Sequence, residues 1–423
     1  MKILWVEEPL LPQVAQLTGE KPSFAGGWLV SVCNDLLSMP ENELVVCYRS
    51  VRGFHRCSGG RLTGWSFVQD PLQYSKDLEQ RFYALLQEEQ PDVIHIWGTE
   101  FPSSLAMLNA AERLNMLDRA VVSIQGLTSI YALHYTAGLP DSVVNSFTFR
   151  DFLRCDNIQQ QQKKYAKRGE FEVAALKKTR HVIGRTRWDS ACVNQINPNA
   201  EYHRCNETLR PEFYEGSWSP ETCERNTIFV SQGNYPIKGF HMALKALAIL
   251  KRDYPDIKLI TTGEDPLVKG WRAKLRRSSY ARYLAQQIRV LGLEHRVEFL
   301  GSLNAEQMRE QYLRAHVALN PSSIENSSNA IGEAQKLGTP VVASYVGGTP
   351  DLMDGLSDGL LYPFDEPYML AYSVDQILGS DEYARRLCEY GREAAWHRHH
   401  RVNNRQVLWS IYQTLASAPK QKE

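Results

Sequence analysis

Residues 317–344 read VALNPSSIENSSNAIGEAQKLGTPVVAS, and their pattern indicates the fold class of this chain. The segment starts with a short apolar run, passes through a polar turn into a stretch with helical spacing, and ends in a second apolar run. A Gly-Thr-Pro sequence closes the helical stretch. The whole therefore predicts a strand, a helix and a second strand, the repeating unit of a parallel α/β sheet. The apolar stripe of the helix, with a period of about 3.6 residues, is formed by Ala330, Ile331, Ala334 and Leu337.

Similar strand-like runs recur along the rest of the chain. Because they lack polar alternation, they predict parallel strands buried on both faces. The chain of 423 residues is longer than a single hydrophobic core usually allows, so two domains are expected. The alternation of strands and helices predicts that both are Rossmann-like, doubly wound α/β domains. We place them at residues 1–210 and 211–395, with a C-terminal helix at about residues 396–423 that packs back on the first domain. The runs cover residues 2–6, 43–48, 92–97, 120–125 and 181–185, then 227–233, 257–263, 296–301, 317–321, 340–344 and 359–362.

Composition narrows the class of protein. Lys plus Arg and Asp plus Glu both total 48, so no overall basic field is present to hold nucleic acid. No run approaches the roughly 18 apolar residues of a membrane-spanning helix. The eight cysteines form no C-x-x-C pair, which is typical of reduced thiols rather than of a disulfide framework or a zinc site. We therefore expect a cytoplasmic protein.

Two segments, residues 163–180 and 269–289, are basic and mixed with aromatic residues. The simpler interpretation is a solvated helix face on which the stems of Lys and Arg cover apolar surface. The alternative is a patch that binds an anionic acceptor or the inner face of a membrane. In that case the protein would be peripheral to the membrane.

Several common catalytic motifs do not occur in the sequence. There is no G-x-G-x-x-G after an early strand, and no G-K-[ST] ending of a P-loop, G-x-S-x-G, D-x-D or H-E-x-x-H. HRHH, residues 397–400, lies in a helical segment without a cysteine or carboxylate cluster, and predicts packing rather than metal ligation. We expect neither a metal nor a bound cofactor.

Two glutamates border the polar turn of the opening stretch. Glu325 comes just before the helix, near the carboxyl end of the strand, and Glu333 lies at the edge of the apolar stripe. In open parallel sheets, ligands bind at this edge. The turn between them, residues 326–329, offers backbone N–H groups at a helix N-terminus, which suits a phosphate, although Asn and Ser are also ordinary N-caps.

The sequence E-N-S-S-N-A-I-G-E-A, followed by L-G-T-P-V-V-A-S and G-G, resembles the E-x7-E signature of retaining, nucleotide-sugar-dependent glycosyltransferases of family 4. These enzymes have the GT-B fold, two Rossmann-like doubly wound parallel-sheet domains that face a central cleft. The resemblance extends to FAGGWLVSVCNDLL, DVIHIWGTE, SIQGL, VSQGNYPIKGFHMALKAL and RVEFLGSL. It implies metal-independent transfer of a hexose-type sugar from a UDP- or GDP-sugar to a hydroxyl of a glycan or lipid-linked acceptor. The implied role is the synthesis of cell-surface polysaccharide or glycoconjugate.

The resemblance also implies residue roles. Glu325 would contact hydroxyls of the donor sugar, and Glu333 would bind the two ribose hydroxyls, because a carboxylate can accept from both. Lys238 would neutralise the pyrophosphate, work that a metal does elsewhere. The implied catalytic residues are Glu325, Lys238 and Gln125, and the implied donor-binding residues are Gly26, Gly27, Gln232, Asn234, Gly301, Leu303, Asn326, Ser327, Ser328, Asn329 and Glu333.

Two positions depart from the pattern of the family. Gln125 stands where many members have His, and Gln232 where many have Arg. A glutamine still hydrogen-bonds a hydroxyl but carries neither a proton nor a charge. These departures leave two alternatives open: a non-catalytic sugar-nucleotide-binding subunit of a glycan assembly complex, or a GT-B sugar-nucleotide epimerase. Epimerisation needs proton-transfer groups near the sugar, and Gln125 argues against it.

Overall fold

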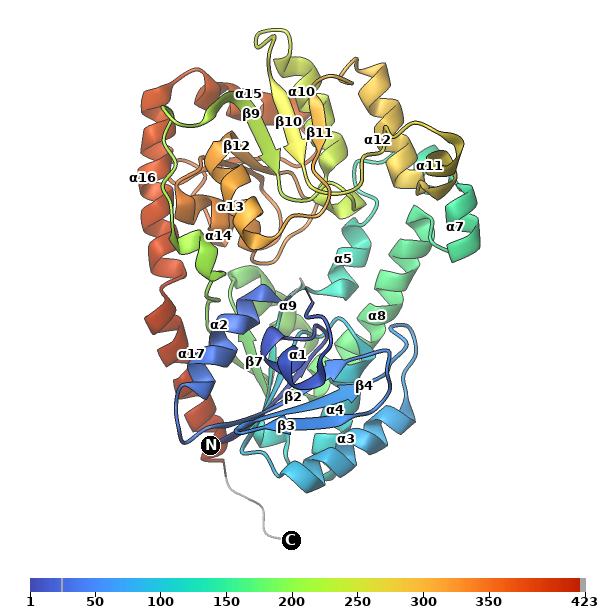
Figure 1. The fold of residues 1–423 in the computed structure, drawn as a ribbon, viewed down its shortest axis with the longest axis vertical. Coiled ribbons are helices and arrows are strands. Elements are labelled where there is room, and N and C mark those ends of the chain that lie inside the picture. Colours follow the sequence, from blue (N-terminus) through green and yellow to red (C-terminus); the bar gives the residue numbers. More distant parts are fainter. Residues whose placement is uncertain (24–25, 419–423) are drawn as a thin grey trace. The chain divides into compact units, whose positions relative to one another are not determined.

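The computed structural model describes residues 1–23 and 26–418, and the chain divides into two compact units. Unit 1 comprises Met1–Ile130, Tyr165–Arg210 and His399–Glu423, and unit 2 comprises Tyr131–Lys164 and Pro211–Arg398. Each unit is built on its own mainly parallel sheet, and some strands of each sheet are labelled in Figure 1. The predicted fold class, two parallel-sheet α/β domains, is confirmed.

Unit 1 contains an eight-stranded sheet of order β3-β4-β2-β1-β5-β6-β7-β8. Its ladders are parallel except for the antiparallel pair β3 and β4. From β1 the chain builds first toward β3 and later, from β5 on, toward β8, so the strand order reverses between β1 and β5. The strands are β1 (Lys2–Glu7), β2 (Glu43–Arg49), β3 (Arg56–Gly59), β4 (Leu62–Phe67), β5 (Val93–Trp97), β6 (Ala120–Ser123), β7 (His181–Gly184) and β8 (Glu201–Arg204).

The two faces of this sheet are covered by different helices. Ile3 and Trp5 of β1 pack with residues of α1 (Pro12–Thr18), α2 (Gly27–Leu37) and α17 (Arg401–Ala416). Leu4 and Val6, which alternate with them, pack with α3 (Lys76–Glu89) and α4 (Pro102–Arg113) on the other face. Burial on both faces explains the continuous apolar runs of the sequence. The remaining helices with residues in unit 1 are η1 (Leu117–Arg119), α5 (Thr128–His134), α8 (Ile158–Lys178) and α9 (Arg187–Ile196).

Unit 2 contains a six-stranded parallel sheet of order β11-β10-β9-β12-β13-β14. Read in chain order this is the 3-2-1-4-5-6 arrangement of a Rossmann fold, which reverses between its first and fourth strands, β9 and β12. The strands are β9 (Glu224–Val230), β10 (Lys258–Thr261), β11 (Val297–Phe299), β12 (Ala315–Asn320), β13 (Val341–Ser344) and β14 (Leu360–Tyr362). The helices are α6 (Asp141–Val144), α7 (Phe149–Arg154), η2 (Pro211–Tyr214), η3 (Pro236–Lys238), α10 (Phe240–Leu250), α11 (Trp271–Arg276), α12 (Ser279–Val290), α13 (Ala305–Arg314), α14 (Asn329–Leu337), η4 (Thr349–Asp351), α15 (Pro367–Leu378) and α16 (Asp381–Arg398).

The stretch that opened the sequence forms β12, α14 and β13. Three of its predicted stripe residues, Ile331, Ala334 and Leu337, are buried. The helix ends at Gly338, whose φ of 88° lies in the left-handed region that favours glycine. The predicted strand, helix and strand are confirmed.

Residues 131–164 lie within the first domain by the sequence-based boundaries, whereas in the structure they cluster with unit 2. Their contacts show why. The Ser323 hydroxyl donates to the His134 carbonyl at 3.0 Å, and His241 Nε2 lies 3.2 Å from the Ala137 carbonyl oxygen. The Ser279 N–H donates to the Asp151 carboxylate at 2.8 Å. Within residues 1–23 and 26–418, no helix has the length and hydropathy needed to cross a membrane.

Candidate functional site

The candidate site lies in unit 2, where the strand order reverses between β9 and β12. At such a point the loops that follow the two strands run in opposite directions and leave a crevice at the carboxyl ends. The two loops are in direct contact, because the Ser323 N–H donates to the Ile237 carbonyl at 2.8 Å. A Cβ at Gly239 would lie only 1.7 Å from the Pro321 carbonyl oxygen, so the loops approach this closely because residue 239 is glycine.

An ion pair joins the two loops. Lys238, at the end of η3, places its Nζ 2.5 Å from Oε1 of Glu325, in the loop after β12. The Ser322 hydroxyl donates to the same carboxylate oxygen at 2.7 Å. The Glu325 side chain is 8% exposed and that of Lys238 is 29% exposed. The structure thus brings together two of the predicted catalytic residues, and it holds the carboxylate in a fixed orientation by charge and by hydrogen bonding.

The backbone of Glu325 is fixed by the predicted glycine pair after β13. The Gly348 N–H donates to the Glu325 carbonyl at 3.0 Å. A Cβ at Gly347, whose φ is +50°, would lie 2.0 Å from the same oxygen. The G-G of the sequence therefore permits a close backbone approach that positions Glu325.

In the polar turn before α14, the structure shows how the Asn326 N–H and the Ser328 side chain are hydrogen-bonded. The Asn326 N–H donates to the hydroxyl of Tyr131 at 3.1 Å, so this amide already has a partner. Ser328 is the N-cap of α14, but its side chain makes no capping bond to the helix, and its hydroxyl accepts from the Asn320 side chain at 2.8 Å. Ser327 and Asn329 are half-buried, and Glu333 is buried.

The loops after β9, β10 and β11 meet at the same edge of the sheet. Gly263 and Gly301 exchange backbone hydrogen bonds of 2.8 and 3.2 Å. The side chain of Asn234 covers Gly263, where a Cβ would lie 2.0 Å from Asn234 Oδ1. Gln232 and Leu303 are half-buried in these loops. Eleven of the predicted site residues therefore belong to unit 2, and their loops follow β9, β11 and β12.

The other three predicted residues, Gly26, Gly27 and Gln125, belong to unit 1. Gly26 is the N-cap of α2 and Gly27 its first residue. A Cβ at Gly27 would lie 2.8 Å from Cδ of Arg210, so this helix start is tightly packed. Phe24 and Ala25, the first two residues of the FAGGWLVSVCNDLL segment, lie outside the described residues.

Gln125 is part of a polar group that the sequence did not predict. Its side-chain amide donates to Oε1 of Glu207 at 2.7 Å, and Nη1 of Arg185 lies 2.5 Å from Oε2 of the same carboxylate. Arg185 also donates to the Ile124 carbonyl at 3.1 Å. Arg185 directly follows β7. A charged residue at the end of a buried strand is the feature of the sequence from which it could have been predicted. Gln125 is thus oriented by Glu207, which is itself fixed by Arg185.

Arg185 and Glu207 border a pocket inside unit 1. Apolar and aromatic side chains make up much of its wall, with Trp28, Trp97 and Trp409 as the largest. An aromatic wall beside a charged pair suits a ligand with an apolar face and hydroxyl groups.

Glu100 is a further carboxylate that the sequence did not single out. It follows β5, where the strand order of unit 1 reverses, and accepts from the Gly126 N–H at 3.0 Å. Burial, aided by the negative charge of Glu172, raises the pKa of Glu100 to about 7. Glu7, the last residue of β1, is also buried, and burial raises its pKa well above the usual range. Neither carboxylate oxygen of Glu7 has a hydrogen-bond partner among the described residues.

Residues 218–394 match the sequence family described as Glycosyl transferases group 1, and this stretch contains Lys238, Glu325 and Glu333. The D-inositol 3-phosphate glycosyltransferase of Corynebacterium urealyticum is 31% identical over 187 residues, 44% of this chain and 42% of that protein. An uncharacterized glycosyltransferase of Bacillus subtilis is 31% identical over 182 residues, 43% of this chain and 47% of that protein. The chain therefore matches less than half the length of these curated relatives.

Solved structures resemble the chain over nearly its whole length. Sucrose-phosphate synthase from Thermosynechococcus elongatus has a TM-score of 0.68 at 16% identity, covering 99% of this chain and 100% of that one. HepE from Anabaena, solved in complex with UDP-glucose, has a TM-score of 0.67 at 17% identity, covering 98% of this chain and 100% of that one. These similarities show the fold, which is the GT-B fold.

Proposed function

We propose that this chain is a retaining glycosyltransferase of family 4, which transfers a hexose-type sugar from a nucleoside diphosphate to a hydroxyl of a glycan or lipid-linked acceptor. The contact between Lys238 and Glu325 carries the proposal. It places a cation and an oriented carboxylate at the switch point of a Rossmann sheet, within the stretch that matches Glycosyl transferases group 1.

Lys238 binds the pyrophosphate of the donor. Without donor, its ammonium group is held by Glu325; when the donor binds, the phosphate oxygens share that charge. Backbone N–H groups in the first turn of α14 add further donors. Glu325, kept in place by Ser322, then accepts hydrogen bonds from hydroxyls of the transferred sugar.

The nucleoside half of the donor contacts the other predicted residues at the carboxyl edge of the unit 2 sheet. Glu333 accepts from the two ribose hydroxyls. The backbone around Gly301 and Leu303 contacts the base, and Gln232 and Asn234 lie on the phosphate side. UDP and GDP are both candidates, and UDP-glucose, the ligand in the HepE structure, is the first donor to test.

The chemistry is bond cleavage assisted by charge. As the glycosidic bond to the phosphate breaks, negative charge builds on the leaving phosphate, and Lys238 stabilises that charge more in the transition state than in the ground state. The acceptor hydroxyl attacks from the same face, and its proton passes to a leaving phosphate oxygen, so the anomeric configuration is retained. The two glutamates hold the donor and are not the acid/base pair of a glycosidase.

The test is sugar transfer in the presence of EDTA, using UDP- and GDP-sugars with glycan and lipid-linked acceptors. Glu325→Gln removes the sugar-binding charge but leaves Lys238 available to phosphate. We expect it to lower transfer by about 100-fold while UDP binding stays within about threefold of the wild type. Glu264→Gln, which changes an exposed carboxylate in the loop after β10, is the matched control and should keep full activity. Full transfer by Glu325→Gln would contradict the assigned role.

The second candidate is a non-catalytic sugar-nucleotide-binding subunit. It is favoured by Gln125, which cannot carry a proton and is held by Glu207. This candidate predicts donor binding with neither transfer nor hydrolysis for any donor and acceptor pair. The same assay therefore separates the two functions.

A further inference from the structure

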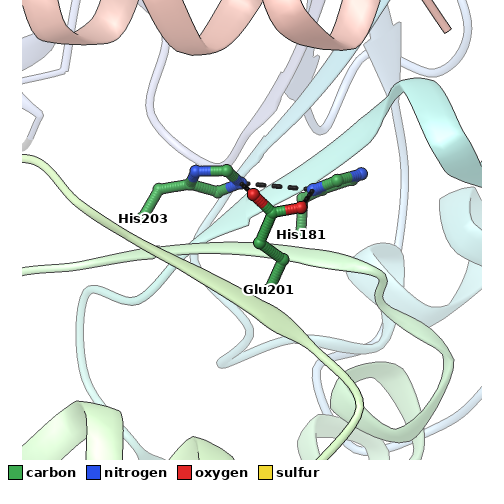
Figure 2. A group of neighbouring side chains, drawn as sticks. All are labelled: His181, Glu201 and His203. Carbon is green, nitrogen blue, oxygen red and sulfur yellow. Dashed lines mark hydrogen bonds and ion pairs between the residues drawn. The ribbon is translucent and has the colours of Figure 1, made fainter.

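Two histidines and a glutamate meet on β7 and β8, at one edge of the unit 1 sheet. β7 and β8 pair in parallel with His181 opposite Glu201 and Ile183 opposite His203. Because alternate residues of a strand share a face, Glu201 and His203 project on the same side as His181. β8 is the edge strand of the sheet. The Glu201 side chain is 62% exposed, whereas those of His181 and His203 are mostly buried. Figure 2 shows the Glu201 carboxylate lying beside the line that joins the two imidazole rings.

The spacing of the three ligand groups is close to that of a tetrahedral metal site. His181 Nδ1 lies 3.2 Å from His203 Nε2 and 3.3 Å from Glu201 Oε2. The other carboxylate oxygen, Glu201 Oε1, lies 3.9 Å from His203 Nε2. With zinc–nitrogen and zinc–oxygen bonds of about 2.0–2.2 Å, the ligands of a tetrahedral site are about 3.3–3.6 Å apart. The two distances from His181 are close to this spacing, and one ligand atom from each of the three residues lies within 4.8 Å of the other two.

The charges around the two rings also suit a cation. The Glu201 carboxylate lies beside both rings, and Arg180, the residue before His181, is paired with Asp118. Imidazole binds a metal ion through the lone pair of a neutral ring nitrogen.

We propose that His181, Glu201 and His203 bind a divalent transition-metal ion, with zinc as the reference ion. Two imidazoles and one carboxylate favour zinc over the hard ions magnesium and calcium, which prefer oxygen ligands. The bound ion cross-links β8 to β7, whose shared ladder is only four residues long. His181 and Glu201 are the first residues of their strands, so the site lies away from the carboxyl ends where Gln125 and Glu207 meet. The ion is therefore structural and takes no part in sugar transfer.

The sequence alone could not indicate this site. Nineteen residues separate His181 from Glu201, an interval too long to form a compact metal-binding motif. Only the register of two neighbouring parallel strands places the three side chains together.

The test is calorimetric titration of the full-length, EDTA-treated protein with zinc chloride at pH 7, together with melting curves. We expect one strong site per chain and a higher melting temperature in zinc. His203→Gln and Glu201→Gln should each weaken zinc binding by at least about tenfold. The Glu201 side chain is 62% exposed, so its replacement leaves the fold intact. His295→Gln, which changes an exposed histidine of unit 2, is the control and should bind zinc as the wild type does.

Cobalt provides a second readout. Cobalt(II) in a tetrahedral site gives visible absorption, which should appear with the wild type and be absent in His203→Gln. Cys155 is the exposed cysteine of the chain, and Cys155→Ser should leave both the titration and the spectrum unchanged. Zinc binding that is absent, or equal in the wild type, Glu201→Gln and His203→Gln, would overturn the proposal. Because these readouts do not involve a sugar nucleotide, the proposal stands or falls independently of the proposed function.

Discussion

Glu100 shows how position in the sheet shifts the chemistry of a single side chain. It lies after β5 and is half-buried beside Glu172, and its pKa is raised to about 7 by burial. Between pH 4.5 and 7 the unfolded chain loses this proton while the folded chain keeps it. The free energy of unfolding contributed by Glu100 is therefore fully present below about pH 4.5 and falls as the pH rises to 7.

Glu100→Gln should remove this loss. The amide oxygen can still accept from the Gly126 N–H, so the local structure is kept. Relative to the wild type, the variant should gain about 1–3 kcal/mol in unfolding free energy between pH 4.5 and 7. Urea denaturation at several pH values measures this difference. Glu41→Gln changes an exposed carboxylate and is the control. A constant difference between Glu100→Gln and the wild type across this range would contradict the raised pKa.

At the same scale, the two partners of the unit 2 ion pair were predicted from sequence, but not their contact. Glu325 and Lys238 each follow a buried strand, and this position is apparent from the sequence alone. Their approach to 2.5 Å requires that β9 and β12 be neighbours, and this depends on strand order. Tyr131, whose hydroxyl accepts from the Asn326 amide, could not be predicted because the two residues are 195 positions apart in the sequence.

The element that matters most for the site is the loop between β12 and α14, and glycines from other elements fix its path. Gly347 has a φ of +50° and would place a Cβ 2.0 Å from the Glu325 carbonyl oxygen. Gly60, in the turn between β3 and β4, has a φ of +61° with nothing within 4 Å of its would-be Cβ. Comparing alanine variants of Gly60 and Gly347 therefore separates the free-energy cost of a left-handed backbone from the cost of a steric clash with the Glu325 carbonyl oxygen.

Gly60→Ala should lower the free energy of unfolding by about 1 kcal/mol, the cost of the backbone conformation alone. Gly347→Ala should lower it by at least about 2 kcal/mol, because the Glu325 loop must also move. Only Gly347→Ala should reduce sugar transfer. Chemical denaturation and the transfer assay measure the two effects. Equal losses of stability and full activity in both variants would show that Gly347 does not position Glu325.

Elements were predicted well where local pattern decides them. α14 begins and ends where its apolar stripe and its Gly-Thr-Pro sequence indicate. The side strand β8 was missed, since Glu201–Arg204 is polar and joins the sheet only by pairing with β7. A strand held by its neighbour rather than by its own apolar face leaves no periodic signal.

At the scale of the molecule, the chain passes between the two units several times, and residues 131–164 illustrate the difficulty of predicting this. Their helical spacing is ordinary, and their membership of unit 2 rests on contacts with residues more than 100 positions away, such as His241 with Ala137. The two sheets themselves could be predicted, because each repeats the same strand–helix alternation.

Amide hydrogen exchange, measured along the whole chain with and without UDP, should locate the nucleotide site. If the donor binds at the switch point of unit 2, UDP should slow exchange most strongly in residues 231–239 and 321–337. These segments carry Lys238 and both glutamates. The sheet core around β13 should change little. Protection that spares both loops would place the nucleotide elsewhere.

Calorimetric titration with UDP and GDP tests whether Lys238 holds the pyrophosphate of a sugar nucleotide. Lys238→Ala should weaken binding of the preferred nucleotide by about 10- to 100-fold, the value of a charged hydrogen bond. Lys258→Ala, at the first residue of β10 and thus at the opposite end of the same sheet, should leave the affinity unchanged. Equal nucleotide affinity in the wild type and Lys238→Ala, or no nucleotide binding by the wild type, would contradict this role of Lys238.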